Sequence, residues 1–150
     1  MRHVKDQTEE ICLAAVKKNG WAFEYAKHQT EAICSFAVKA DGLLLEYVHD
    51  QTEGLCLAAV QQDGDALKFV RVQTDPICLA AVKQHGRALQ YVLYQTKEIC
   101  VEAVKQNIFA LDFVQPDYFT DAVNAVRMRG LFDEEIHSYI EKLKALKGFI

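Results

Sequence analysis

Hydrophobic and polar positions along the chain repeat with one fixed period of 22 residues. Each period holds a longer apolar stretch with cysteine and alanine, a polar turn, and a shorter apolar stretch with an aromatic residue near its end. The cysteines mark the period most plainly, because each follows the previous one by 22 positions: Cys12, Cys34, Cys56, Cys78 and Cys100. Self-similarity at a fixed period of this length is typical of tandem repeat proteins, in which each repeat is one structural unit.

The longer stretch of each repeat is predicted to be an α-helix, which in the first unit covers residues 9–18. Thr8 suits the N-cap position, and Glu9 and Glu10 place negative charge at the positive end of the helix. Apolar residues occupy more than one side of this helix, so it needs neighbours on more than one side. Asn19 and Gly20 are predicted to end it, with the glycine in the left-handed conformation that satisfies the last carbonyl groups.

The shorter stretch of each repeat is predicted to be a second helix of about two turns. A strand remains an alternative, because residues 43–48 form an apolar run of strand length that periodicity alone does not exclude. Alanine begins four of the five stretches and a polar residue precedes each aromatic one, which favours the helix. A leucine-rich repeat is disfavoured because the chain lacks the L-x-x-L-x-L strand motif.

These elements predict an all-α fold, an α-solenoid of 22-residue helix-turn-helix repeats that forms a single domain over residues 1–150. The repeats are expected at residues 7–28, 29–50, 51–72, 73–94 and 95–116, followed by a degenerate sixth unit at 117–132. Residues 133–149 are predicted to form a C-terminal capping helix. Its apolar positions follow helical spacing: Ile136, Tyr139, Ile140, Leu143 and Leu146.

Composition and charge narrow the classes of partner. The chain is 51% hydrophobic and 25% charged, which is ordinary for a folded soluble protein. A net charge of −4, without a basic run, argues against nucleic acid. No apolar stretch reaches the roughly 20 residues that span a membrane, and the N-terminus lacks the apolar region of a signal peptide. We therefore expect a cytoplasmic protein with reduced cysteines.

The spacing of the cysteines argues against metal and redox chemistry. Zinc sites pair cysteines two to four residues apart, whereas here one whole repeat separates each pair. Stacked helices lie about 8 to 10 Å apart, too far for a disulfide between equivalent cysteines. The cysteines are therefore predicted to be small core residues. Because the sequence also lacks a nucleophile elbow, a phosphate loop and a metalloprotease motif, we expect no cofactor, no metal and no enzymatic activity.

A glutamine also recurs once in every repeat, at Gln7, Gln29, Gln51, Gln73 and Gln95. Such a residue can bind the open backbone groups of the neighbouring loop, which is a structural role; a ligand-binding stripe is the alternative.

The junction, defined as the two residues before each repeated glutamine, varies between repeats and changes from charged to apolar along the chain. If the junctions line one edge, Val72, Leu93 and Tyr94 form an exposed partner-binding patch, together with Arg71 of the same junction as Val72 and His49 of the junction before it. In the alternative, these side chains pack under the capping helix.

The chain begins inside a repeat, because Val4 is in register with Val48, Val70 and Val92. This observation predicts either a piece of a longer solenoid or end-to-end self-association through an uncapped N-terminal half-repeat.

The signature I-C-L-A-A-V-K-Q-x-G-x-A-L-x-Y-V at residues 77–92 resembles a family of tandem helical repeats known as a domain of unknown function, which occurs in intracellular bacteria, amoebal viruses and protists. The resemblance covers residues 4–114 and implies a helical array and a role in proteins delivered to a host cell. We expect a non-catalytic protein-protein interaction scaffold. A structural or regulatory segment of a larger enzyme is the alternative.

Overall fold

The computed structural model describes residues 7–130 and 133–148, and every regular element within these ranges is helical. Five units each combine a ten-residue α-helix with a six-residue 3₁₀ helix. The units consist of α1 (Glu9–Lys18) with η1 (Gly20–Tyr25), α2 (Glu31–Ala40) with η2 (Gly42–Tyr47), α3 (Glu53–Gln62) with η3 (Gly64–Phe69), α4 (Asp75–Gln84) with η4 (Gly86–Tyr91), and α5 (Lys97–Gln106) with η5 (Ile108–Phe113). Two longer helices follow, α6 (Pro116–Met128) and α7 (Glu134–Lys147).

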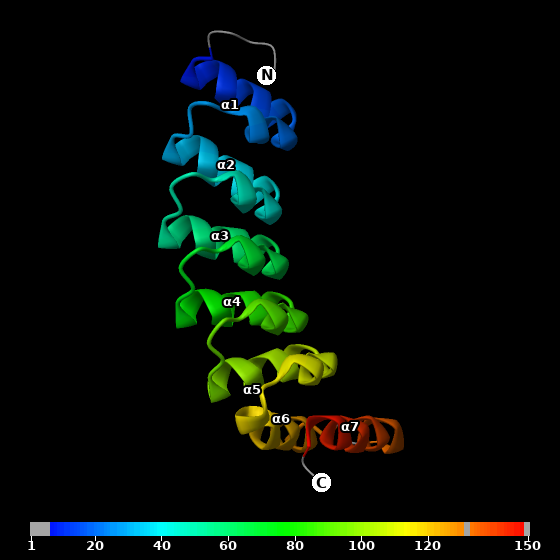
Figure 1. Ribbon diagram of the computed structural model, residues 1–150. Helices are drawn as coiled ribbons and strands as arrows, with labels where there is room; N and C mark the ends of the chain where they lie inside the picture. Colours follow the sequence, from blue (N-terminus) through cyan, green and yellow to red (C-terminus); the bar gives the residue numbers. More distant parts are fainter. Residues whose placement is uncertain (1–6, 131–132, 149–150) are drawn as a thin grey trace.

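The units stack into an elongated column with two layers (Figure 1). Each α-helix packs against the α-helix of the next unit, and each 3₁₀ helix packs against the next 3₁₀ helix. Each α-helix after the first also contacts the 3₁₀ helix of the preceding unit, which joins the two layers. The predicted all-α solenoid is therefore confirmed, and the second element of each repeat is a helix rather than a strand.

The repeated threonines begin the α-helices, as predicted. Each occupies the N-cap with extended backbone, and three of them accept a hydrogen bond from the backbone N–H three residues later: Thr8, Thr52 and Thr96. The other two act between units, because Thr30 Oγ1 donates to Glu9 and Thr74 Oγ1 donates to Glu53. A threonine at this position therefore either caps its own helix or links its unit to the preceding one.

The predicted left-handed glycines at the helix ends are wrong. Positive φ occurs among the described residues only at Gly130 and Gly148. Each of the first five α-helices instead ends at a C-cap residue with extended backbone, such as Asp63 at φ −144°. In four of these five units the side chain of that residue also starts the following 3₁₀ helix, since Asp63 Oδ1 accepts from the N–H of Asp65 at 2.9 Å, whereas His85 makes no such bond.

Glycine is required at this position by a close approach between units. Cβ atoms added at Gly42, Gly64 and Gly86 would lie 2.4, 2.6 and 2.5 Å from a backbone carbonyl oxygen of the next unit. The N–H of each glycine donates to a glutamine side chain of that unit at 2.6 Å, and these acceptors are Gln62, Gln84 and Gln106. Where the next unit has no such glutamine, the approach is looser: Gly20 faces Leu44 at 3.4 Å. In the fifth unit, Ile108 takes the place of glycine.

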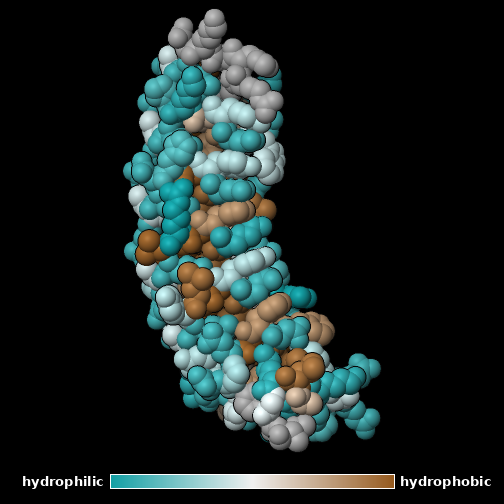
Figure 2. Space-filling view, in the orientation of Figure 1, coloured by the Kyte–Doolittle hydropathy of each residue, from teal (hydrophilic) through white to brown (hydrophobic). Residues whose placement is uncertain are grey.

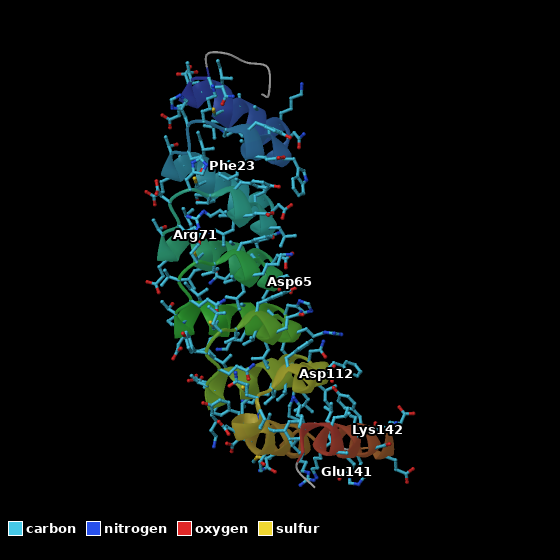
Figure 3. The ribbon with its side chains drawn as sticks, viewed as in Figure 1. Phe23, Asp65, Arg71, Asp112, Glu141 and Lys142 are labelled. Carbon is cyan, nitrogen blue, oxygen red and sulfur yellow. The ribbon has the colours of Figure 1, made fainter. Side chains whose placement is uncertain are left out.

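The core runs continuously between the two layers. It contains the cysteine and valine of α1 to α5, an alanine from α2 to α5, large residues of the 3₁₀ helices, and the aliphatic residue that follows each 3₁₀ helix. Phe23, which Figure 3 labels in the first unit, is fully buried there. All five cysteines are buried and free, as expected for core residues.

The α7 helix lies beside α6 at the last end of the stack (Figure 1). Asp133 caps it by accepting from the N–H of Ile136 at 2.8 Å. It is attached to η5 by a hydrogen bond from Tyr139 Oη to Asp112 Oδ1 at 2.7 Å and by edge-to-face packing of Tyr139 on Phe109. Ile140 and Leu143 are buried as predicted, but Leu146 is 82% exposed. The expectation for Leu146 is wrong, because no described residue of the stack covers that side of the final turn.

Candidate functional site

The junctions lie along one edge of the column, where each 3₁₀ helix passes to the next α-helix. The repeated glutamines fix their backbone. Gln73 accepts from the N–H of Leu93 at 3.0 Å and donates to the carbonyl oxygen of Tyr91 at 2.8 Å. Gln29, Gln51 and Gln95 make the same pair of bonds with the next junction.

The thiols bind the same glutamines from inside, since Cys78 Sγ donates to Gln73 Oε1 at 3.6 Å. Both ends of the amide therefore bind the protein itself, which confirms the predicted structural role. The alternative, a stripe of amides open to a ligand, is therefore wrong for Gln29, Gln51, Gln73 and Gln95.

Three neighbouring junction side chains project from this fixed backbone as an exposed apolar group, which we call the apolar edge: Val72, Leu93 and Tyr94. Their exposed fractions are 74%, 64% and 84%. Figure 2 shows hydrophobic atoms at the left of the molecule, at the level of the loops that lead into α4 and α5. These side chains do not pack under α7, so the alternative that placed them there is wrong.

A hollow of about 430 Å³ adjoins the apolar edge. It lies between the junctions that precede α3 and α4, and Val72 lines it together with His49, Asp50, Glu53 and Arg71. Glu53 and Thr74 form a bond across it at 3.3 Å. The hollow has room for a side chain, and its lining is mixed polar and apolar.

The predicted charged members of the site, Arg71 and His49, are joined to each other. The Arg71 guanidinium donates to the carbonyl oxygen of His49 at 2.5 Å and to that of Val48 at 3.1 Å. Arg71 therefore holds two units together at the rim of the hollow. Figure 3 shows Arg71 on the junction side and Asp65 on the opposite edge, where Asp65 binds His85 at 2.8 Å.

The cysteines are poor nucleophiles in this environment. Burial raises the pKa of the Cys78 thiol to about 11, with a smaller contribution from Asp75. Burial also raises the pKa of the Cys100 thiol to about 11. Thiols with such values stay protonated at neutral pH. Within residues 7–130 and 133–148, no group of three or more His, Cys, Asp or Glu side chains is arranged to hold a metal ion.

Two features of the site were not predicted from the sequence. The second row of glutamines, at Gln62, Gln84 and Gln106, recurs at one repeat position and was detectable as a period of 22. The hollow beside Val72 had no such signal, because its walls come from two units. The N-terminal half-repeat, on which end-to-end association was predicted, falls within residues 1–6 and lies outside the described residues.

The fold and the apolar edge define this chain as an α-solenoid with an exposed apolar group on the edge where its units join. A family model described as "Domain of unknown function (DUF4116)" matches residues 77–119. The match overlaps the resemblance noted in the sequence but covers a smaller part of it. No curated protein and no solved structure matches the chain. In the part of the chain that the structure describes, no helix is both long and apolar enough to cross a membrane.

Proposed function

We propose that this solenoid binds a protein partner through the apolar edge, with the adjoining hollow as a recess for one partner side chain. The observation that carries this proposal is the exposure of Val72, Leu93 and Tyr94, at 64% or more each, on adjacent units. Exposed apolar groups beside a recess mark interaction sites more often than isolated hydrophobic residues do.

The framework supports recognition because it separates structural from variable positions. The repeated glutamine of each unit holds the backbone of the next junction through its amide, so the two residues of that junction are free to vary. A solenoid presents such variable positions at regular intervals along an extended surface. In this chain the junction that contains the charged Arg71 is followed, one repeat later, by the apolar junction of Leu93 and Tyr94.

Affinity capture with matched variants tests the proposal. Wild-type protein, the double variant Leu93→Ser/Tyr94→Ser and the control Met128→Ser/Leu146→Ser are immobilised and exposed to the same cell lysate. Met128 and Leu146 are 90% and 82% exposed and lie on α6 and α7, so the control removes similar apolar surface elsewhere. All three proteins should melt within a few degrees of each other, since exposed side chains contribute little to stability.

We expect at least one protein that the wild type and the control retain and that the Leu93→Ser/Tyr94→Ser variant loses. Equal retention by all three forms would contradict a role for the apolar edge. Loss with both double variants would show that exposed hydrophobic surface in general, and not this edge, captures the protein.

We further propose that the protein acts in a reducing compartment, the cytoplasm of its own cell or of a host cell. The five free buried thiols support this location. Fractionation of cells that express the tagged full chain tests it, and recovery only outside the cytoplasm would contradict it.

A further inference from the structure

The outer surface of the α-layer is organised independently of the junction edge. The middle of α1, α3 and α4 carries a half-buried leucine at one repeat position, Leu13, Leu57 and Leu79, where α2 has Ser35. At the next position α2 carries Phe36, which is 38% exposed. Between α3 and α4 these side chains line a shallow groove of about 580 Å³, which includes Leu57, Pro76 and Leu79. An apolar strip therefore runs along the stack over several units.

Charged side chains border this strip on both sides. The first turns of α1 to α4 carry an acidic row, which consists of Glu9, Glu10, Glu31, Glu53 and Asp75. The last turns of α1, α2 and α4 carry a lysine row, which consists of Lys17, Lys18, Lys39 and Lys83, whereas the last turn of α3 has no basic residue. All these residues are exposed, and none forms an ion pair with another described residue. The two rows lie at opposite ends of the helices, which are too long for the rows to pair within one chain.

The arrangement is complementary to itself in one orientation. A two-fold axis parallel to the stack brings two α-layers face to face, keeps each helix at the level of its own copy and reverses its direction. The acidic row of one copy then faces the lysine row of the other, and the helix dipoles run antiparallel. The other possible two-fold axis is perpendicular to the stack and parallel to the helices. It would place the acidic row of one copy against the acidic row of the other, and the two lysine rows against each other, which is repulsive.

The surface of two copies together reaches about 1,200 Å², the lower end of the range for stable interfaces. A ten-residue helix is about 15 Å long, and four stacked helices extend over roughly 40 Å, so the face measures on the order of 600 Å² per copy. A standard protein interface buries about 800 Å² per partner. The centre of the face is apolar and its borders are charged, which is the usual anatomy of such an interface.

We propose that the outer face of the α-layer is a self-association surface, through which two copies of this chain pair in parallel about a two-fold axis that runs along the stack. The apolar strip meets its own copy at the centre, and the acidic and lysine rows pair on both sides. The residues that pair in this dimer do not include Val72, Leu93 or Tyr94, so the proposal does not depend on the partner that binds to the apolar edge.

Charge reversal tests the pairing of the rows. Sedimentation velocity over a range of concentrations measures the dissociation constant of the full chain and its variants. Lys39→Glu/Lys83→Glu and Glu31→Lys/Asp75→Lys, which both alter α2 and α4, should each weaken the dimer by more than about tenfold, because each variant turns attractive pairs into repulsive ones on both sides of the two-fold axis. An equimolar mixture of the two variants should dimerise, because a doubly acidic face meets a doubly basic one.

Cysteine cross-linking tests the orientation. Phe36 and Ala80 occupy the same position of α2 and α4. In the parallel dimer each lies opposite its own copy, so Phe36→Cys alone and Ala80→Cys alone should each form an intermolecular disulfide on mild oxidation. The unchanged chain, whose native cysteines are buried, is oxidised in the same way and gives the background level of intermolecular disulfide.

Three results would overturn the proposal. A wild-type chain that stays monomeric over the whole concentration range has no such interface. A dimer that neither charge reversal weakens uses another surface. Disulfides that form only when Phe36→Cys and Ala80→Cys are mixed would show antiparallel stacks.

Discussion

Replacement of Gly64 by alanine tests the close approach between units, which the structure makes the main reason for glycine at this repeat position. The added Cβ would lie 2.6 Å from the carbonyl oxygen of Ala81 and 2.9 Å from Gln84 Oε1. The backbone of Gly64 has no positive φ, so alanine suits its conformation and only the contact opposes it. The Ala81 carbonyl belongs to the middle of α4 and cannot turn aside, so the third and fourth units must separate by roughly 0.5 Å or more.

The expected cost follows from two contributions. Overpacking of a tight contact costs about 1 to 3 kcal/mol. The hydrogen bond from the Gly64 N–H to Gln84 at 2.6 Å is stretched by the same movement, and its loss costs about 1 kcal/mol. Together they give about 2 to 4 kcal/mol. For a chain of 150 residues this lowers the melting temperature by about 5 to 15 °C.

Thermal unfolding followed by far-ultraviolet circular dichroism measures the effect, with Gly54→Ala as the matched control. A Cβ at Gly54 meets nothing within 4 Å, and Gly54 lies in the first turn of α3. Alanine there should raise stability by about 0.5 kcal/mol, because glycine loses more backbone entropy in a helix. Equal melting temperatures for Gly64→Ala and Gly54→Ala would refute the reasoning.

Two further predictions concern the buried polar groups. Gln73→Ala removes the bonds to the Leu93 N–H and the Tyr91 carbonyl oxygen and leaves both backbone groups without their partner. We expect the free energy of unfolding, measured in urea, to fall by about 2 to 4 kcal/mol. A fall below about 0.5 kcal/mol would show that water replaces the amide. The thiols should resist alkylation at pH 8 while the protein is folded and react rapidly in urea, and fast reaction of Cys78 or Cys100 in the folded state would contradict their burial. Because the folded pKa of these thiols is raised from 9.0 to about 11, the unfolded chain releases its protons first, and the free energy of unfolding should fall as pH rises from about 9 to about 11. A flat pH profile in that window would contradict the raised pKa.

The period of the sequence was enough to predict the stack. Thr8 and Glu9 mark the start of the first helix and Asn19 its end, and the α-helix covers residues 9–18 as predicted. These signals are local, because a cap or a turn depends on residues within a few positions of each other. The structural role of the repeated glutamine was also predictable, since an amide at one position of every repeat has the same backbone groups within reach each time.

The partner-binding role of the junctions remains a prediction, but their exposure is an observation. The sequence left open whether Leu93 and Tyr94 pack under the last helix, because the position of α7 depends on contacts between residues far apart in the chain, such as Tyr139 with Asp112. A sequence motif contains no information about which surface such a helix covers until the chain is folded.

By itself the sequence determined the type of each element, the order of the units and the residues that fill the core, because helical propensity, capping and apolar periodicity are properties of neighbouring residues. Only the tertiary structure decided why glycine follows α2, α3 and α4. A glycine at a helix end ordinarily indicates left-handed backbone, but Gly42, Gly64 and Gly86 have none and are instead needed because a carbonyl oxygen of the next unit lies within 2.6 Å of the place of a Cβ. The physical reason is distance: that oxygen is 17 positions away in the sequence, at Ala59, Ala81 or Ala103, and comes close only when the units stack.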